Sequence, residues 1–262
     1  MSVAALSEMF AAARAAGRPV FMPFMTAGIP DQERSLAVFE QLAAAGADAF
    51  ELGIPYSDPL MDGAVIQAAS ARALDGGMTF LGGLELAGRV ADATGKPIIV
   101  MTYVNPILQA GPEAFAAEAA ALGIAGVIIA DVPFEEAASI KDALAEHGVG
   151  LALFAAPTTD ESRLRAIVEA QPTFIYAVAD LGVTGRRARV SGHLEGLVRR
   201  IRAVTSIPVV LGVGISTPDQ AAAAAGLADG VIVGSALVSE VLESGSAASG
   251  SAFAEAVHGA GR

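Results

Sequence analysis

The sequence has no cysteine and few basic residues, and both shortages narrow the possible functions. Without cysteine among its 262 residues, the chain has no disulfide, no thiolate metal ligand and no thiol nucleophile. Sixteen Lys and Arg against 28 Asp and Glu give a net charge of −12, which disfavours a nucleic-acid partner. A chain without cysteine fits a reducing compartment, so we expect a cytoplasmic protein.

Long apolar runs are also missing. Although 53% of the residues are hydrophobic, no run approaches the roughly 20 residues that span a bilayer, and we expect no membrane association. The Ala-rich start carries Glu8 and Arg14 where a signal peptide would have its apolar core, and no basic segment precedes them. We therefore expect an amphipathic N-terminal helix.

Short apolar runs alternate with longer stretches rich in Ala, Leu, Glu and Arg. This pattern is typical of strands that are buried on both faces and separated by helices. A glycine turn, a small residue and an apolar run recur after Ala45, Leu122 and Ala225, which indicates one repeated strand–helix unit. The eight expected strands are 20–25, 49–53, 97–103, 126–131, 150–155, 174–178, 208–212 and 230–234.

Eight strand–helix units predict an α/β fold, a single (β/α)8 TIM barrel over residues 1–262 with an extra N-terminal helix. A doubly wound sheet is the alternative, but residues 26–30 after the first strand do not form a dinucleotide-binding fingerprint. We expect helices to begin after N-caps at Asp31, Asp160 and Thr217.

Catalytic groups in such a barrel come from the carboxyl ends of the strands. Neither Lys96 nor Lys141 lies at such an end, so Schiff-base chemistry is excluded. His147, His193 and His258 neither follow a strand nor share metal-ligand spacing, and we expect no metal site. Carboxylates and tyrosines remain for proton transfer.

Glu51 interrupts a strand that is otherwise apolar. A carboxyl group that points into a barrel mouth has a raised pKa and can act as both acid and base. The alternative is a structural glutamate that pairs with a buried arginine or a backbone amide, but no arginine lies at a neighbouring strand end. Asp62 follows eleven residues later in a loop that can reach the same mouth; alternatively it is the N-cap of a helix over 63–74.

Glycine-rich turns follow the last three expected strands. They are residues 182–185, 212–216 and 234–236, the last of which opens a helix. Backbone N–H groups in such loops, together with a helix N-terminus, can bind a phosphate without a cationic side chain. The alternative is that these glycines serve tight turns with positive φ.

Several motifs together resemble the tryptophan synthase α subunit family along nearly the whole chain. The longest is Glu51-Leu52-Gly53-Ile54-Pro55-Tyr56-Ser57-Asp58-Pro59-Leu60-Met61-Asp62-Gly63. The others are Pro23-Phe24-Met25-Thr26-Ala27-Gly28-Ile29-Pro30, Tyr103-Val104-Asn105-Pro106, Ala130-Asp131-Val132-Pro133, Gly182-Val183-Thr184-Gly185 and Gly234-Ser235-Ala236.

This resemblance implies a lyase that splits indole-3-glycerol phosphate into indole and glyceraldehyde 3-phosphate, in the last steps of tryptophan biosynthesis. By matching motif, Glu51 would be the acid/base at the C3′ hydroxyl and indole C3, and Asp62 would stabilise positive charge at the indole N1–H. Tyr176 would order the site. The expected indole-pocket residues are Phe24, Met101 and Ile128, and the expected phosphate-binding residues are Gly185, Gly214, Gly234 and Ser235.

The resemblance also implies a partner. The family's α subunit has no cofactor of its own and joins a β subunit that carries pyridoxal phosphate, in an α2β2 heterotetramer. By matching motif, Asp58, Asn105 and Pro133 would face that subunit.

Two other functions remain open from the sequence. One is a phosphosugar isomerase or epimerase on the same phosphate site, although the expected His or Lys is missing. The other is a barrel that binds a phosphorylated ligand without catalysis and acts as a partner subunit.

Overall fold

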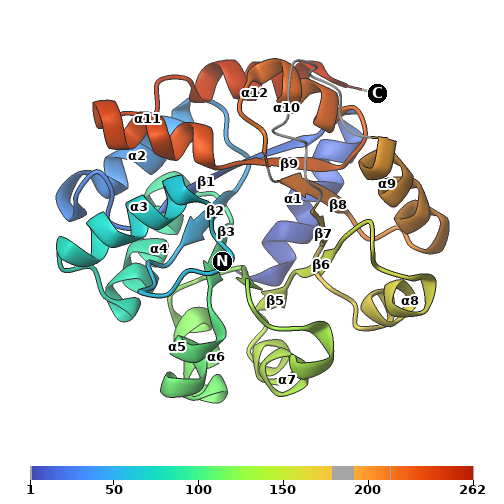
Figure 1. The fold of residues 1–262 in the computed structure, drawn as a ribbon, viewed down its shortest axis with the longest axis horizontal. Coiled ribbons are helices and arrows are strands. Elements are labelled where there is room, and N and C mark those ends of the chain that lie inside the picture. Colours follow the sequence, from blue (N-terminus) through green and yellow to red (C-terminus); the bar gives the residue numbers. More distant parts are fainter. Residues whose placement is uncertain (1, 179–191, 213, 262) are drawn as a thin grey trace.

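A ring of parallel strands surrounded by helices forms the computed structural model, which describes residues 2–178, 192–212 and 214–261 (Figure 1). The strand order is β5-β4-β3-β2-β1-β9-β8-β7-β6, and the paired strands are parallel. The predicted (β/α)8 barrel is therefore confirmed. The strands are β1 Val20–Thr26, β2 Phe50–Gly53, β3 Ile98–Thr102, β4 Gly126–Ile129, β5 Gly150–Leu151, β6 Leu153–Ala155, β7 Ile175–Ala177, β8 Val209–Gly212 and β9 Gly230–Val233.

The nine strands correspond to the eight predicted units, because the fifth strand is divided at Ala152. Its first part, β5, pairs with β4, and its second part, β6, pairs with β7. The N–H of Thr173, just before β7, donates to the Leu151 carbonyl oxygen of β5 at 2.9 Å. The two ends of the strand order, β5 and β6, are consecutive in the chain on either side of Ala152. The division thus turns the chain from one neighbour to the other without opening the barrel.

The helices begin where the sequence predicts caps. The side chains of Asp31, Asp160 and Thr217 accept hydrogen bonds from the backbone N–H three residues ahead, so all three predicted N-caps are confirmed. The helices are α1 Val3–Ala15, α2 Gln32–Ala44, α3 Ala64–Asp75, α4 Phe80–Thr94, α5 Val104–Ala110, α6 Pro112–Ala121, α7 Ala138–Glu146, α8 Glu161–Glu169, α9 Gly192–Val204, α10 Pro218–Ala225, α11 Ser235–Ser244 and α12 Gly250–Gly259, with a short 3-10 helix η1 at Phe134–Glu136.

The predicted extra helix, α1, covers the amino-terminal end of the barrel. Its Leu6 is fully buried and would meet a Cβ added at Gly126, the first residue of β4. Phe10 packs against Phe174, which precedes β7, with ring centroids 6.1 Å apart. Because this end is filled by the helix, the cavity of the barrel opens at the opposite, carboxyl-terminal end of the strands.

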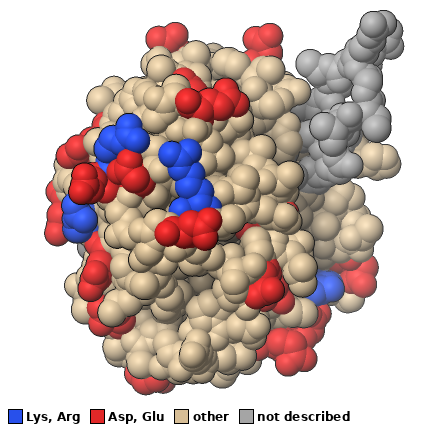
Figure 2. Space-filling view, turned by 60° about the vertical axis from the view of Figure 1, so that its left-hand side comes forward, with Lys and Arg blue, Asp and Glu red and all other residues tan. Residues whose placement is uncertain are grey.

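Acidic side chains outnumber basic ones on the face that Figure 2 shows, and they are scattered over it. This distribution agrees with the net charge of −12. Within the described ranges, no helix combines the length and the hydrophobicity that a membrane crossing requires.

Candidate active site

A cavity of about 680 Å³ lies at the carboxyl ends of the strands. Its walls are mostly apolar. Its titratable side chains are the carboxyl groups of Glu51, Asp62 and Asp131 and the hydroxyl group of Tyr176. No lysine or histidine is among the described residues that line it. The lining is Phe24, Glu51, Met61, Asp62, Gly63, Ile66, Met101, Ala130, Asp131, Val132, Pro133, Phe154, Tyr176, Val178, Gly214, Ile215, Ile232, Gly234 and Ser235.

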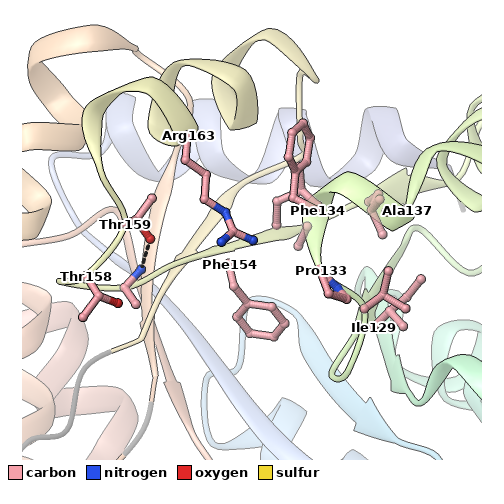
Figure 3. A pocket seen from close by; sticks show the side chains of 13 residues that line it. Ile129, Pro133, Phe134, Ala137, Phe154, Thr158, Thr159 and Arg163 are labelled. Carbon is pink, nitrogen blue, oxygen red and sulfur yellow. Dashed lines mark hydrogen bonds between the residues drawn. The ribbon is translucent and has the colours of Figure 1, made fainter.

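A second cavity of about 210 Å³ lies beside the first and shares Val132, Pro133 and Phe154 with it. Figure 3 shows this smaller cavity with Arg163 of α8 and Phe134 of η1 around it. Arg163 donates to a Glu135 carboxylate oxygen at 2.9 Å. Because its described lining contains no carboxylate and no tyrosine, the groups suited to proton transfer belong to the larger cavity.

The Glu51 carboxyl group is buried in β2 and faces the larger cavity. Glu51 is 1% exposed, and its Oε2 has no hydrogen-bond partner among the described atoms. Burial, with a smaller contribution from the negative charge of Asp62, raises the pKa of Glu51 from 4.5 to about 8. The structural ion pair that was the alternative is absent from the described residues, since the salt bridges there do not include Glu51. At neutral pH this group is a protonated acid with a free oxygen in a cavity.

This burial predicts that Glu51→Gln stabilises the fold at neutral pH. Between pH 4.5 and about 8 the unfolded chain loses a proton that the folded chain keeps on Glu51, so the free energy of unfolding falls as pH rises through this window. Glutamine stays neutral and removes that loss, which amounts to about 3 kcal/mol at pH 7. Denaturant unfolding of the wild type and the variant at pH 4 and pH 7 measures this difference in the free energy of unfolding.

Glu85→Gln provides the matched control, because Glu85 is exposed on α4. We expect this variant to unfold like the wild type at both pH values. Equal stability of Glu51→Gln and wild type at pH 7 would contradict the raised pKa of Glu51.

Asp62 lies in the loop between β2 and α3, and its carboxyl group faces the same cavity. Burial raises the pKa of Asp62, whereas a hydrogen bond from the Tyr103 hydroxyl lowers it. The helix-cap alternative for Asp62 is wrong, because Gly63 is the N-cap residue of α3 and no side chain caps this helix. The carboxyl group is therefore available to a ligand.

Tyr176 on β7 lines the same cavity and is buried against aromatic neighbours. Its ring packs against Phe154 and Phe174 at centroid distances of 5.2 and 6.3 Å. Burial and the charge of Glu51 raise the pKa of Tyr176 well above its usual value, so its hydroxyl stays a hydrogen-bond donor.

Gly212 sets the position of this tyrosine, which leads to a second prediction. A Cβ added at Gly212 would lie 2.3 Å from the Tyr176 hydroxyl oxygen and 2.8 Å from its Cε2. The ring is confined by its aromatic neighbours, so Gly212→Ala must shift it within the cavity. We expect kcat/KM for the reaction of this site to fall about 100-fold, as displacements near 1 Å do.

The control is Gly196→Ala on α9, where an added Cβ meets no atom within 4 Å. Steady-state kinetics of both variants measure the difference. Wild-type kcat/KM in Gly212→Ala would show that Tyr176 does not need its observed position.

The predicted phosphate residues that the structure describes lie together at one side of the cavity. Gly214 follows β8 with φ +73°, a conformation that favours glycine, and Gly234 and Ser235 open α11. Among the described residues no side chain caps this helix, so the N–H groups of its first turn have no side-chain partner there. The fourth predicted phosphate residue, Gly185, lies outside the described residues.

Two of the three predicted indole-pocket residues line the cavity, and the third is buried behind it. Phe24 and Met101 line the cavity. Ile128 pairs with Met101 across β3 and β4 and is fully buried, but it is not part of the cavity lining. The lateral pairing puts Ile128 on the inward face of the barrel, whereas burial by its neighbours keeps it off the cavity surface.

The predicted partner-facing residues, Asp58, Asn105 and Pro133, are all exposed. Pro133 also lines the cavity. Large apolar side chains are exposed nearby in sequence: Leu60 is 89% exposed, Met61 65% and Leu108 55%.

Sequence reasoning missed the apolar side of the cavity that Phe154 and Ile232 provide. Phe154 pairs with Tyr176 across β6 and β7, so the two rings share the inward face. Its signal in the sequence is only that of an aromatic residue in a buried strand. Tyr103, the last residue of the expected strand 97–103, contacts the loop that carries Asp62 through the Met61 N–H.

Comparisons with known proteins find one family. The sequence profile described as tryptophan synthase alpha chain matches residues 10–258. The chain is 46% identical to the tryptophan synthase alpha chain of Phenylobacterium zucineum over 93% of this chain and 88% of that protein. It is 43% identical to the Streptomyces avermitilis protein of the same description, over 94% of this chain and 88% of that one.

Solved structures agree with the sequence relatives. A Mycobacterium tuberculosis tryptophan synthase structure superimposes with a TM-score of 0.89 at 39% identity, over 97% of this chain and 98% of that one. The tryptophan synthase subunit alpha of Legionella pneumophila superimposes with a TM-score of 0.89 at 32% identity, over 98% of both chains.

Proposed function

This chain belongs to the tryptophan synthase alpha chain family, and we propose that Glu51 and Asp62 carry the chemistry of its active site. The chain is a carbon–carbon lyase that cleaves indole-3-glycerol phosphate to indole and glyceraldehyde 3-phosphate in tryptophan biosynthesis. The observation that supports the assignment best is the buried Glu51, with a pKa of about 8 and an unpartnered oxygen, in the same cavity as Asp62.

The proton transfers proceed from the protonated state of Glu51. Its proton goes to indole C3, and the positive charge that results at the indole N1–H is stabilised by the Asp62 carboxylate. The Glu51 carboxylate then takes the proton of the C3′ hydroxyl, the C3–C3′ bond breaks, and the electron pair returns to the indole ring. C3′ becomes the aldehyde carbon, and Glu51 ends protonated, ready for another cycle.

The remaining cavity residues bind the substrate. The N–H groups at the start of α11 and the loop at Gly214 hold the phosphate, with Gly234 and Ser235 at the helix end and Gly185 completing the set. The free first-turn N–H groups of α11 support this arrangement. Phe24 and Met101 contact the indole ring, and Tyr176 orders the site. Ile128, which is buried beside Met101, supports the indole pocket from behind.

A tryptophan synthase β subunit is the proposed partner, in an α2β2 complex. This chain needs no cofactor for the cleavage, and pyridoxal phosphate belongs to the β subunit. The exposed Asp58, Asn105 and Pro133, together with exposed Leu60 and Met61, support a contact surface beside the cavity. We also propose a cytoplasmic location, which suits a chain without cysteine.

Incubation of the purified chain with indole-3-glycerol phosphate tests the function, with and without a β subunit. We expect equimolar indole and glyceraldehyde 3-phosphate in both cases. No cleavage under either condition, with retained binding of the substrate, would favour a barrel that binds without catalysis. Turnover of a phosphosugar in its place would favour the isomerase.

A further inference from the structure

Tyr103 is a buried side chain whose hydroxyl lies beside the catalytic loop. It follows β3 as the N-cap residue of α5 and is 2% exposed. Its hydroxyl oxygen accepts a hydrogen bond from the Met61 N–H at 3.1 Å. The same hydroxyl donates to the Asp62 carboxyl group. One hydroxyl therefore contacts two consecutive residues of the loop.

Both ends of the loop between β2 and α3 form hydrogen bonds with the unit of β3 and α5. At its start, the Ile54 N–H donates to the Met101 carbonyl oxygen at 2.8 Å. At its far end, the contact is the Tyr103 hydroxyl. Within the loop, the Asp62 N–H donates to the Pro59 carbonyl oxygen at 3.0 Å, a local turn that does not fix the loop against the barrel.

Stacking holds the Tyr103 ring in place. Its ring lies 4.9 Å from that of Tyr56, with an interplanar angle of 26°. The Tyr56 hydroxyl in turn accepts a hydrogen bond from Asn105 Nδ2 at 3.1 Å. Because Asn105 belongs to α5, the same helix that Tyr103 precedes, the two tyrosines form a rigid support for the loop.

We propose that Tyr103 is a positioning residue, which holds the Asp62 carboxylate in the orientation that faces the indole N1–H. This inference rests on the proposed function, since Tyr103 would act by orienting the Asp62 carboxylate in that reaction. A carboxylate accepts hydrogen bonds through two oxygens. Tyr103 occupies one acceptor position, and the other stays directed to the substrate.

The charges around these groups fit this role. Burial and the negative charges of Asp62 and Asp131 raise the pKa of Tyr103, so its hydroxyl keeps its proton at neutral pH. Asp62 faces Glu51 and Tyr103, whose hydrogen bond lowers the pKa of Asp62 against the effect of burial. Tyr103 therefore also favours the ionised state that Asp62 needs.

The test is Tyr103→Phe, which keeps the ring and its stacking on Tyr56 and removes the hydroxyl. We expect kcat to fall about 10- to 100-fold, with KM changed less than about threefold. Because Asp62 loses the hydrogen bond that lowers its pKa, the acid limb of the kcat/KM profile should move to higher pH. A merely structural tyrosine would not move this limb.

A double-mutant cycle with Asp62→Asn separates the two roles. If Tyr103 acts through Asp62, its replacement in the Asp62→Asn background should lower kcat by less than about twofold more. Fully additive losses, or a wild-type kcat and acid limb in Tyr103→Phe, would overturn the proposal. Binding of a non-cleavable substrate analogue without the C3′ hydroxyl, and thermal unfolding, verify that the variants are folded.

The outcomes also separate this inference from the proposed function. If the wild type does not cleave indole-3-glycerol phosphate, the function fails and the Tyr103 role with it. If the wild type cleaves the substrate and Tyr103→Phe behaves like it, only the positioning role fails.

Discussion

Glu51→Gln is expected to lower indole release by about 1,000-fold. The amide retains the size and shape of the protonated carboxyl group but neither gives a proton to indole C3 nor takes one from the C3′ hydroxyl, and general acid–base groups contribute about 10² to 10⁴ to a rate. Because the substituted side chain is 1% exposed and lacks an ion-pair partner among the described residues, the substitution should not disturb packing. Binding of the substrate should remain.

Stopped assays of indole, with substrate binding measured separately, check this expectation. Glu85→Gln on the exposed face of α4 should have wild-type activity. If Glu51→Gln released indole at the wild-type rate, the proton transfers would have to come from another group, and the proposed mechanism would be wrong.

Asp62→Asn is expected to lower kcat about 100-fold, because a neutral amide does not stabilise the positive charge at the indole N1–H. It should also change the pH profile. The negative charge of Asp62 contributes to the raised pKa of Glu51, so its removal lowers the pKa of Glu51 below about 8. Since the reaction starts from protonated Glu51, the alkaline limb of kcat/KM should move to lower pH.

Steady-state rates of the wild type and Asp62→Asn between pH 5 and pH 10 measure the fall in kcat and the shift of the alkaline limb. Asp75→Asn is the control, because Asp75 is exposed at the end of α3. An unchanged alkaline limb in Asp62→Asn, with a lowered kcat, would show that the two carboxylates do not interact. An unchanged kcat would remove Asp62 from the mechanism.

The barrel could be predicted from the sequence because each unit carries its own signals. Apolar runs mark the strands, and Asp31, Asp160 and Thr217 cap helices through contacts three residues away. Glu51 could be selected for the same reason, since a charged residue inside an apolar strand is a local anomaly. These features depend on residues close in sequence.

Contacts between distant residues could not be predicted in this way. Whether Asp62 caps α3 or faces the cavity depends on where its loop lies, and Tyr103, which contacts that loop, is about 40 residues away. The inward direction of Phe154 depends on the division of the fifth strand at Ala152, which sets the pairing with Tyr176. The burial of Ile128 beside Met101 likewise depends on packing around two strands.

Titration of the Glu51 carboxyl group tests whether this residue is the proton donor of the cleavage. Isotope-edited infrared or carbon NMR spectra of the wild type, with Glu51→Gln as the reference, measure the pKa of this single group. We expect a pKa of about 8 that coincides with the alkaline limb of kcat/KM for indole release. A titration near 4.5, the ordinary value, would contradict a buried Glu51 that acts as the proton donor.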